Sequence, residues 1–441
     1  MMRFTIYNLF WHLLRPVIPL LLRWRAWRGK EMITCLQDRY GLPNFDQLPS
    51  GGQSKGDLIW IHAVSVGETV AAIGLAKALI GKLPTARLLI TTNTVSAAAM
   101  VEKEVASGVC LSHAFQPLDH PHFVDQFLAI TRPMLAIFIE SDFWPNLITR
   151  TAARSIPIVF ASSQLSDVAF QRWQRQSVMA KAIFTAPKHI FAVNEQQACQ
   201  FERLGADAGR ITVLGSLKLG SLVAVDPVLC KQLKTAIGNR HVLLAASTHE
   251  GEDASIIAAA NALDNHRQDK KWLTIIAPRH PTRGGRIAAA SDNAPQRSRG
   301  DWPSTDHNIY IMDSFGELGN LFSLADLVVL GGAFVPKGGH NPLEPAAFGL
   351  PIFTGPHIFK NAAEFAGLRD AGVVFDITKD ADLRDATATG QALARLARDL
   401  IDDKNKRRHI AGAAKAYAAA ASLRCEIAAR KILEHRLLDK S

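Results

Sequence analysis

The chain has 441 residues, of which 48% are hydrophobic and 20% are charged. This composition is that of a globular protein with more than one core, and it excludes collagen-like, disordered and disulfide-scaffold proteins. Six of the ten net positive charges come from residues 1–30, which contain no acid. Because this excess is not spread along a binding face, we expect no nucleic-acid partner. The five cysteines form no C-x-x-C pair, which indicates a reducing compartment and predicts no metal site.

Residues 4–22 are apolar but are interrupted by His12, Arg15 and two prolines. A spanning helix needs about 20 apolar residues, and the arginines and tryptophans that follow do not form a signal-peptide cleavage site. Aromatic and basic residues around a short apolar stretch are typical of a segment in a membrane interface, next to the anionic cytoplasmic leaflet. We therefore predict that residues 1–30 anchor the protein to this leaflet. A helix packed on its own domain is the alternative.

Residues 41–57 are rich in Gly, Pro, Ser and Asn and are predicted to be a connector. Beyond it, apolar β-type runs alternate with helical patterns such as 68–82 and 195–204. The strands are predicted at 57–62, 86–92, 134–140, 156–161, 189–193 and 210–214. After a pause near 219–232, further strands are predicted at 241–246, 272–277, 308–312, 326–331 and 351–354, with a surface loop at 292–308 and helices in the Ala-rich region 386–438.

This alternation indicates βαβ units on parallel sheets. The simplest architecture is an α/β protein with two Rossmann-like, doubly wound domains that face each other across a cleft. Ligands of such sheets bind beyond the carboxyl ends of the strands. The predicted parts are an anchor segment (1–30), an N-terminal domain (31–222), a C-terminal domain (223–405) and a helical tail (406–441).

Three charged residues follow predicted strands in the first half of the chain. Glu68 in HAVSVGE falls at a helix start, where it either acts as a general base or only complements the helix dipole. Glu140 in ESDFWPN ends an apolar strand at the same sheet edge, as a helix cap or as a site residue. Lys218 follows a third strand and is either solvated or paired with a carboxylate or phosphate.

Two motifs in the second half also follow predicted strands. The segment STHEGE (247–252) is explained mostly by capping from Ser247 or Thr248, although its free N–H groups can also hold a phosphate. Arg279 in PRHPTR lies at a strand's carboxyl end, where an arginine is suited to clamp a phosphate. An ordinary surface loop is the alternative for Arg279.

The glycine-rich motif GGHNPLEPAA (338–347) predicts a helix start. Asn341 suits the N-cap, Pro342 the first helical position and Glu344 the third, while the glycines let a ligand approach the backbone. The segment 315–317 borders this region. The chain has no G-x-x-x-x-G-K-[ST], G-x-G-x-x-G, H-E-x-x-H or G-x-S-x-G motif, which argues against a P-loop ATPase, an NAD enzyme, a zinc protease and an α/β-hydrolase.

These five motifs, in this order, resemble those of the Kdo transferases, the 3-deoxy-D-manno-octulosonic acid transferases of Gram-negative lipopolysaccharide synthesis. The resemblance runs from about residue 5 to about residue 435. It implies the GT-B fold and an inverting glycosyltransferase that moves Kdo from CMP-Kdo to the lipid A precursor lipid IV-A. It also implies a protein on the cytoplasmic face of the inner membrane. CMP is a workable leaving group without a metal, and the sequence offers no obvious metal cluster, so we expect no metal or cofactor.

By this resemblance, Glu68 matches the family's general base, and Glu140 and Lys218 match its transition-state-stabilising positions. The N-terminal domain is then expected to bind the acceptor and the C-terminal domain the CMP-sugar. The positions that match the family's CMP contacts are Pro278, Arg279, Phe315, Gly316, Glu317, Asn341, Pro342, Leu343 and Glu344.

The chain departs from the family pattern at three positions. The family's Asn-Ala-Arg-Leu-Ser is replaced by a segment with Gln164 in place of the arginine. The family's Gly-Asn-Leu-Lys-Phe-Asp keeps Lys218 here but ends in Gly220. Phe315 replaces the methionine of Met-Gly-Glu. None of these changes removes a proposed catalytic residue, so their effect is expected on acceptor geometry or on the number of transfers.

Two other functions fit the same pattern. One is a GT-B enzyme with a different donor, such as a UDP-sugar. The other is a membrane-bound scaffold that binds a nucleotide without catalysis, although such a scaffold needs neither Glu68 nor Glu140.

Overall fold

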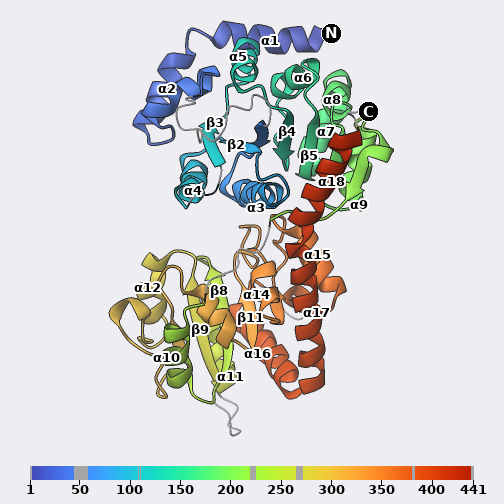
Figure 1. The fold of residues 1–441 in the computed structure, drawn as a ribbon. Helices are drawn as coiled ribbons and strands as arrows, with labels where there is room; N and C mark the ends of the chain where they lie inside the picture. Colours follow the sequence, from blue (N-terminus) through green and yellow to red (C-terminus); the bar gives the residue numbers. More distant parts are fainter. Residues whose placement is uncertain are drawn as a thin grey trace. The chain divides into compact units, whose positions relative to one another are not determined.

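The computed structural model describes residues 2–43, 58–107, 109, 111–218, 225–264, 272–379 and 383–438. The chain forms two compact units, coloured along the sequence in Figure 1. The first unit contains Met1–Leu219 and Leu423–Ser441, and the second contains Gly220–Ser422. The last helix of the chain therefore belongs to the first unit.

The first unit is built on a seven-stranded parallel sheet with the order β3-β2-β1-β4-β5-β6-β7. Its central strands are buried on both faces, which explains their continuous apolar sequences. The strands are β1 (Leu58–His62), β2 (Arg87–Thr92), β3 (Leu111–Phe115), β4 (Leu135–Ile139), β5 (Ile158–Ser163), β6 (His189–Ala192) and β7 (Ile211–Val213).

Helices cover both faces of this sheet (Figure 1). Side chains alternate along β1, so that Ile59 and Ile61 pack in one core layer and Leu58 and Trp60 in the other. The first layer includes residues of α3 (Val66–Lys82), α4 (Val95–Ala106) and α18 (Arg424–Leu438). The second includes residues of α5 (Pro121–Thr131), α6 (Pro145–Ala153), α8 (Ser177–Phe184) and α9 (Glu195–Arg203). The unit also contains α1 (Met2–Leu14), α2 (Ile18–Trp27), η1 (Ile33–Tyr40), α7 (Asp167–Arg175) and η3 (Ala208–Arg210).

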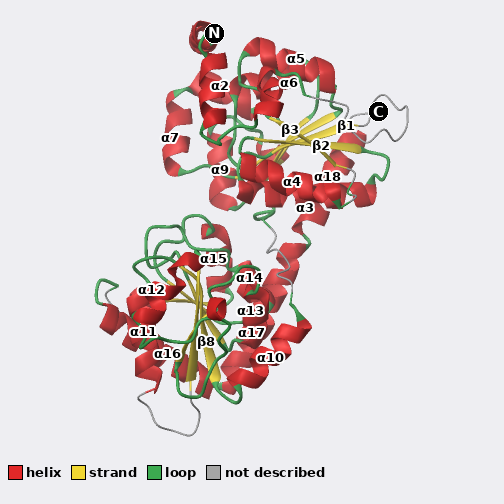
Figure 2. Ribbon diagram, turned by 90° about the vertical axis from the view of Figure 1, so that its left-hand side faces the viewer, coloured by secondary structure: helices red, strands yellow, loops and turns green. Residues whose placement is uncertain are grey.

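The second unit repeats this plan with a six-stranded parallel sheet in the order β10-β9-β8-β11-β12-β13. Figure 2 shows helices on both faces of the sheet. The strands are β8 (His241–Thr248), β9 (Trp272–Pro278), β10 (Ile309–Ile311), β11 (Leu327–Leu330), β12 (Ile352–Thr354) and β13 (Val374–Asp376). The helices are α10 (Pro227–Ile237), α11 (Asp253–Asp264), η4 (Pro281–Arg283), α12 (Gly284–Ala289), η5 (Arg297–Arg299), α13 (Leu318–Leu324), α14 (Leu343–Ala347), α15 (Ala362–Asp370), η6 (Ile377–Lys379), α16 (Ala386–Asp402) and α17 (Lys404–Ser422).

The prediction of two doubly wound parallel sheets is confirmed, and two edge strands are additions to it. β3 was not predicted because its sequence, Leu-Ser-His-Ala-Phe, mixes polar and apolar residues. β13 has only three residues. Of the predicted connector, residues 44–57 lie outside the described part, as does Gly220. None of the described helices is both long enough and apolar enough to cross a membrane.

Candidate active site

Glu68 lies in the first turn of α3, just beyond the carboxyl end of β1. Its backbone N–H donates to Ser65 Oγ at 3.4 Å, and its Oε2 accepts from Ser65 N at 3.2 Å and from Val64 N at 2.5 Å. This is a reciprocal capping box, so the helix-start interpretation of Glu68 is confirmed. All hydrogen bonds of this carboxylate to described residues go to Oε2. The cap therefore orients the group and leaves Oε1 for another partner.

The surroundings of Glu68 favour its protonated form. The residue is only 8% exposed. Burial raises the pKa of Glu68, and the carboxylates of Glu140 and Asp142 raise it further, against the lowering effect of the two backbone N–H groups. A carboxyl group whose pKa is shifted toward neutrality is better matched to accepting and returning a proton near pH 7.

Glu140 and Lys218 form an ion pair beside the start of α3. Glu140 follows β4, the parallel neighbour of β1, and its Oε1 lies 2.7 Å from Lys218 Nζ. A Cβ atom at Gly67 would lie 3.3 Å from Lys218 Cε, so the lysine runs alongside the residue before Glu68. The structure thus brings the three predicted residues of the first unit together. Sequence analysis gave Lys218 a carboxylate or a phosphate as partner, and here it is the carboxylate.

The backbone at Glu140 is held in an unfavourable conformation. Its φ angle is 62°, in the left-handed region that non-glycine residues rarely adopt. The side chain is 6% exposed and accepts a hydrogen bond from Gln164 Nε2 at 3.3 Å. Gln164, which stands where the family has an arginine, therefore contacts the ion pair directly. Strained backbone at a buried charge is typical of a functional site.

A chain of hydrogen bonds leads from the core to Asp142, which sequence analysis did not single out. Trp60 Nε1 donates to Thr91 Oγ1 at 2.8 Å. That hydroxyl lies 2.9 Å from His62 Nδ1, and His62 Nε2 lies 3.0 Å from Asp142 Oδ2. The Trp60 indole can only donate, so the Thr91 hydroxyl accepts from it and can donate its own proton to Nδ1 of His62. The N–H of the imidazole is then on Nε2 and points toward Asp142. Asp142 is thereby fixed near Glu68.

The segment that carries Lys218 is tied to distant parts of the unit. Leu217 N donates to Ser162 Oγ at 3.1 Å, and Ser216 O accepts from Arg424 Nη1 at 3.1 Å. Arg424 begins α18, 208 residues farther along the chain. A Cβ atom at Gly215, whose φ is 90°, would lie 2.6 Å from Arg424 Cζ. Glycine is therefore required there, and it allows the arginine to reach the lysine segment.

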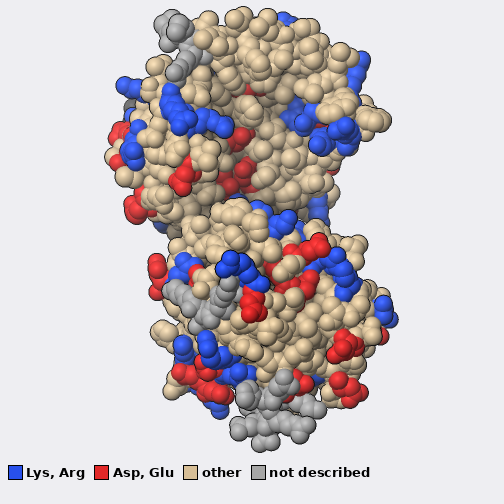
Figure 3. Space-filling view, turned by 180° about the vertical axis from the view of Figure 1, so that it is seen from behind, with Lys and Arg blue, Asp and Glu red and all other residues tan. Residues whose placement is uncertain are grey.

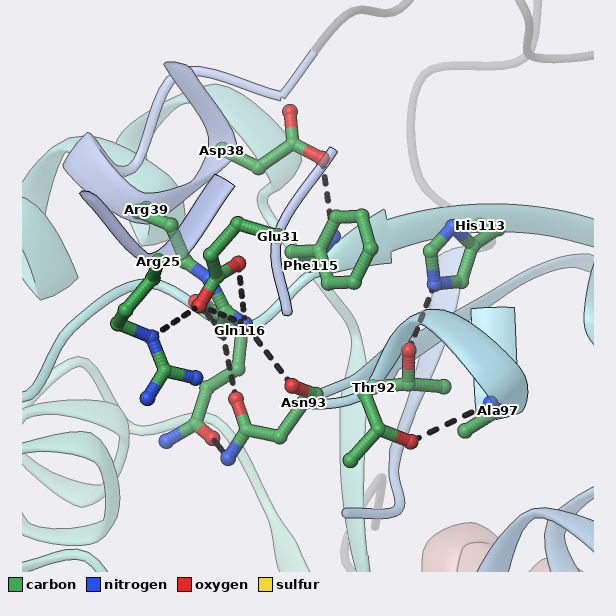
Figure 4. A network of polar contacts seen from close by, with 11 residues as sticks. Arg25, Glu31, Asp38, Arg39, Thr92, Asn93, Ala97, His113, Phe115 and Gln116 are labelled. Atoms are coloured by element: carbon green, nitrogen blue, oxygen red, sulfur yellow. Dashed lines mark hydrogen bonds and ion pairs between the residues drawn. The ribbon is translucent and has the colours of Figure 1, made fainter. Parts of the chain in front are cut away.

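A buried polar network joins η1 to the carboxyl ends of β2 and β3 (Figure 4). The Arg39 guanidinium pairs with Glu31 at 3.0 Å, and both side chains are less than 5% exposed. Arg39 also donates to Asn93 Oδ1 at 2.6 Å and to Gln116 O at 3.0 Å. Asn93 N in turn donates to Val64 O at 3.3 Å, in the segment that caps Glu68. The amino-terminal region is therefore fixed to the same sheet edge as the carboxylates.

The second unit places its predicted nucleotide contacts at the carboxyl edge of its own sheet. Arg279 follows β9 and is exposed, and its backbone N–H donates to Thr248 O at 3.0 Å. Neighbouring Arg283 pairs with Asp253 and donates to Thr248 O at 2.7 Å. The arginine-rich turn is thus anchored through Arg283, while the Arg279 side chain faces solvent. Pro278 ends β9 and is buried.

The helix that was predicted to start at Asn341 begins later. α14 runs from Leu343 to Ala347, with Pro342 at its N-cap, so Glu344 is the second and not the third helical residue. The assigned helix thus begins one residue later than predicted, but Asn341 Oδ1 accepts a hydrogen bond from Leu343 N at 3.1 Å and Pro342 already has helical dihedral angles, so Asn341 caps this turn as predicted. The segment 341–344 nevertheless lies at the end of β11, beside the edge that carries Arg279.

The segment 315–317 lies beyond β10, the edge strand next to β9. Phe315 is 76% exposed, and Gly316 has a φ of 81°. Glu317 pairs with Arg297 at 3.1 Å and accepts a hydrogen bond from Ser314 Oγ. Glu317 is therefore held by its own unit, whereas Phe315 offers a free aromatic face. Within the described ranges, no group of three or more His, Cys, Asp or Glu side chains is placed to hold a metal ion.

Comparisons with known proteins agree with these motifs. A sequence profile described as "3-Deoxy-D-manno-octulosonic-acid transferase (kdotransferase)" matches residues 35–221. The chain is 31% identical to the 3-deoxy-D-manno-octulosonic acid transferase of Haemophilus influenzae, over 80% of this chain and 82% of that one. It is 30% identical to the Bordetella pertussis enzyme of the same name, over 92% and 94%. It is 32% identical to a probable mitochondrial 3-deoxy-D-manno-octulosonic acid transferase of Arabidopsis thaliana, over 80% of each chain.

Solved structures confirm the fold. A glycosyltransferase from Rickettsia africae superposes with a TM-score of 0.57 at 14% identity, over 87% of this chain and 98% of that one. A UDP-GlcNAc 2-epimerase from Neisseria meningitidis gives the same TM-score at 12% identity, over 87% and 100%. At such low identity the likeness concerns the fold alone, and it confirms the predicted GT-B type of two Rossmann-like units.

Proposed function

The chain belongs to the 3-deoxy-D-manno-octulosonic acid (Kdo) transferase family and is a glycosyltransferase, and from this premise we propose a specific reaction. Kdo is transferred from CMP-Kdo to the 6′-hydroxyl of lipid IV-A with inversion at the anomeric carbon. The observation that carries this proposal is the group of Glu68, Glu140 and Lys218 at one edge of the first sheet. A buried carboxylate beside an ion pair suits the activation of a hydroxyl nucleophile.

Glu68 is proposed as the general base. Its Oε2 is held by Val64 N and Ser65 N, so Oε1 already has a fixed position. The side chain therefore loses no further conformational freedom during the reaction. Glu68 takes the hydroxyl proton as the acceptor oxygen forms a bond to the anomeric carbon. The bond between that carbon and the phosphate oxygen breaks, and CMP leaves with the electron pair. A positioned base of this kind contributes about 10²–10⁴ in rate.

The Glu140–Lys218 pair is proposed to stabilise the charge that develops during transfer. The anomeric carbon of a ketose reacts with oxocarbenium character, so positive charge grows there while negative charge grows on the phosphate. Fixed charges act strongly in a site from which water is largely excluded. Glu140 is only 6% exposed and meets that condition, whereas the Lys218 side chain is 25% exposed and meets it in part.

The donor is proposed to bind at the carboxyl edge of the second sheet. The contacts would come from Pro278 and Arg279, from 315–317, and from 341–344. Arg279 is exposed and forms no ion pair with a described residue, so its guanidinium is available to a phosphate. We propose a metal-independent transfer, in which Arg279 and backbone N–H groups offset the charge on departing CMP.

The acceptor is proposed to reach the enzyme from the cytoplasmic leaflet of the inner membrane. α1 is held to the unit by Tyr7, which donates to Asp119 at 2.8 Å, and by His12, which contacts His120 at 3.2 Å, while Phe4 and Trp11 pack against the core. Further apolar side chains are exposed, with Phe10 and Leu13 at 56% and 68%. Exposed apolar side chains of this kind are stabilised by an apolar environment outside the protein.

The second helix extends the same surface. Its exposed side chains include Leu20 and Trp27, at 66% and 80%, and Arg28 lies 4.2 Å above the Trp24 ring. Figure 3 shows one face of the molecule. On this face, the end of the first unit that carries α1 has few charged side chains. Tryptophan and arginine beside apolar residues suit the headgroup region of an anionic membrane.

The first experiment is a mass spectrum of lipid IV-A after incubation with the protein and freshly generated CMP-Kdo. We expect mass gains of whole Kdo units. In Glu68→Gln, the amide oxygen can still accept from Val64 N and Ser65 N, so the cap is kept and turnover falls by about 10²–10⁴. Ser65→Ala is the matched control, because it removes the cap hydroxyl and keeps the carboxylate. We expect about 1 kcal/mol of lost stability and most of the activity retained.

The outcomes separate the alternatives. A folded protein that binds CMP but gives no mass gain would point to another acceptor, with Gln164 as the first residue to examine. Preferential binding of UDP over CMP would point to a UDP-sugar donor. Normal turnover in Glu68→Gln would refute the assignment of the base.

A further inference from the structure

Two histidines meet at the carboxyl edge of the second sheet. His249 follows β8, and His340 lies on the segment after β11, the parallel neighbour of β8. Their Nε2 atoms are 3.0 Å apart, and their rings are parallel to within 2° with centroids 5.2 Å apart. At this distance one nitrogen carries the hydrogen and the other accepts it. The two rings therefore act as a single hydrogen-bonded unit, here called the histidine pair.

The backbone around the histidine pair is built to hold it. The carboxylate of Glu252, which is 1% exposed, accepts hydrogen bonds from His249 N at 2.7 Å, Gly332 N at 2.9 Å and Phe334 N at 3.1 Å. One buried acid thus fixes both segments that carry the pair. A Cβ atom at Gly332 would lie 3.3 Å from His249 Cδ2 and 3.4 Å from His340 Cδ2. A side chain there would crowd both rings.

The charges around the histidine pair are mostly positive. Glu252 is engaged by three N–H groups, and Asp253 is paired with Arg283. The cationic and titratable groups that face the pair are Arg279, His280 and Arg283 beyond β9, Lys337 beyond β11, and Lys360 beyond β12. Of these, Arg279, Lys337 and Lys360 form no ion pair with any residue that the structure describes.

Burial and these cations both disfavour a proton on the pair. Burial, and then the neighbouring cations, lowers the pKa of His249. Burial and His249 lower the pKa of His340 to about 4, with further lowering by Arg279 and Lys360. An anion placed against the rings would offset these charges and favour N–H donation toward it. The electrostatics of the pair are therefore complementary to an anionic ligand.

We propose that the histidine pair binds an anionic group of the nucleotide-sugar donor, either its phosphate or the carboxylate of its sugar, by donating an imidazole N–H to it. This rests on the proposed function, which supplies the donor. Support comes from position: β8 lies between β9 and β11, so His249 follows the strand between the one that precedes Arg279 and the one that precedes His340 and Asn341. The pair therefore lies at the same sheet edge as the proposed donor contacts.

The test compares His249→Asn and His340→Asn with the wild-type protein. Asparagine keeps a polar side chain but cannot take up a proton or form the ring pair. His307→Asn is the control, because it removes an imidazole that contacts Ser304 Oγ at 3.2 Å before the amino end of β10, away from the carboxyl edge and without breaking the pair. Binding of CMP and of cytidine is measured by calorimetry, the KM for CMP-Kdo by transfer assay, and folding by melting temperature.

If the pair holds the phosphate, each pair variant should bind CMP roughly 10- to 100-fold more weakly, with cytidine binding unchanged. If it holds the carboxylate of the sugar, CMP binding stays unchanged while the KM for CMP-Kdo rises by a similar factor. The control should stay within about twofold in both assays.

Pair variants that keep wild-type CMP affinity and wild-type KM overturn the proposal. Equal losses for CMP and cytidine also overturn it, because they indicate a general disturbance of the nucleotide site. If one variant does not fold, the other decides the question. A folded wild-type protein that binds neither CMP nor CMP-Kdo refutes the proposed function itself, which distinguishes that failure from a failure of the pair.

Discussion

Replacement of Lys218 by methionine should lower both stability and turnover, because it leaves Glu140 buried without its cation. The two groups are 2.7 Å apart, and their side chains are 25% and 7% exposed. Removal of one partner from a fully buried pair costs about 3–5 kcal/mol. Lys218 is partly exposed and Gln164 still donates to Glu140, so we expect a loss of about 2–3 kcal/mol.

The double variant Lys218→Met/Glu140→Gln separates stability from catalysis. It removes the uncompensated charge, so most of the lost stability should return, whereas turnover should stay low because neither charge is present. Unfolding in urea, followed by tryptophan fluorescence, measures the first quantity, and the rate of Kdo transfer measures the second.

Lys77→Met is the matched control for this cycle. Lys77 lies 2.7 Å from Glu104, the same separation, but its side chain is 50% exposed. An exposed pair contributes about 0–1 kcal/mol, so this variant should be nearly neutral in stability and activity. If Lys218→Met is no more harmful than Lys77→Met, or if the double variant recovers full turnover, the charged pair does not have the role proposed for it.

Two further predictions concern the amino-terminal region. Burial raises the pKa of Asp119 to about 7, so the folded protein holds this proton more tightly than the unfolded chain does. The stability that this proton contributes is complete below about pH 4 and is lost as the pH rises through about 7. The melting temperature should therefore fall over this range, and Asp119→Asn should make the fall smaller. A pH profile that is the same in the variant and the wild-type protein would contradict the assignment. Leu13→Asp should reduce sedimentation with anionic vesicles at least tenfold, because burial of a leucine contributes about 1.5–3 kcal/mol. The control Leu423→Asp changes a leucine that is 56% exposed, against 68% for Leu13, and should have no such effect. Equal sedimentation of the two variants would exclude α1 from the membrane contact.

The apolar strands could be predicted from sequence because both faces of each central strand are buried. β1, β4, β5, β8 and β9 each contain an apolar run, and the alternation of these runs with helical segments indicates parallel, doubly wound sheets. The edge strands β3 and β13 were not predicted by this criterion. An edge strand is held by one neighbour only and needs neither the length nor the hydrophobicity of a central one.

Glu68, Glu140 and Lys218 could be placed at one sheet edge because each follows a parallel strand. The contacts among them could not be predicted. The φ of 62° at Glu140 and the approach of Lys218 to Gly67 depend on tertiary packing. The roles of His62 and Asp142 were missed, although both lie inside the singled-out motifs. A histidine that closes a buried strand, with an acid just beyond the neighbouring strand, was the available signal.

The dependence of the site on α18 shows why local patterns were insufficient. α18 packs against α3, and its residues Ala428, Ala429 and Ile432 belong to the same core layer as Ile59 of β1. Its first residue, Arg424, holds the Lys218 segment through Ser216. The helix that carries Glu68 and the segment that carries Lys218 therefore rest on one element, more than 200 residues away in sequence.

This arrangement gives the adjacent Ala428 and Ala429 of α18 a physical reason. Small side chains let the helix approach α3 closely, and Cys425, another small residue, is buried with its Sγ 3.8 Å from Leu217 O. Burial raises the pKa of Cys425 to about 12, so the group remains a neutral thiol that fits the apolar layer. A larger or charged residue there would separate α18 from the lysine segment. Because Lys218 must stay within 2.7 Å of Glu140, the spacing of this remote layer sets the geometry of the proposed active site.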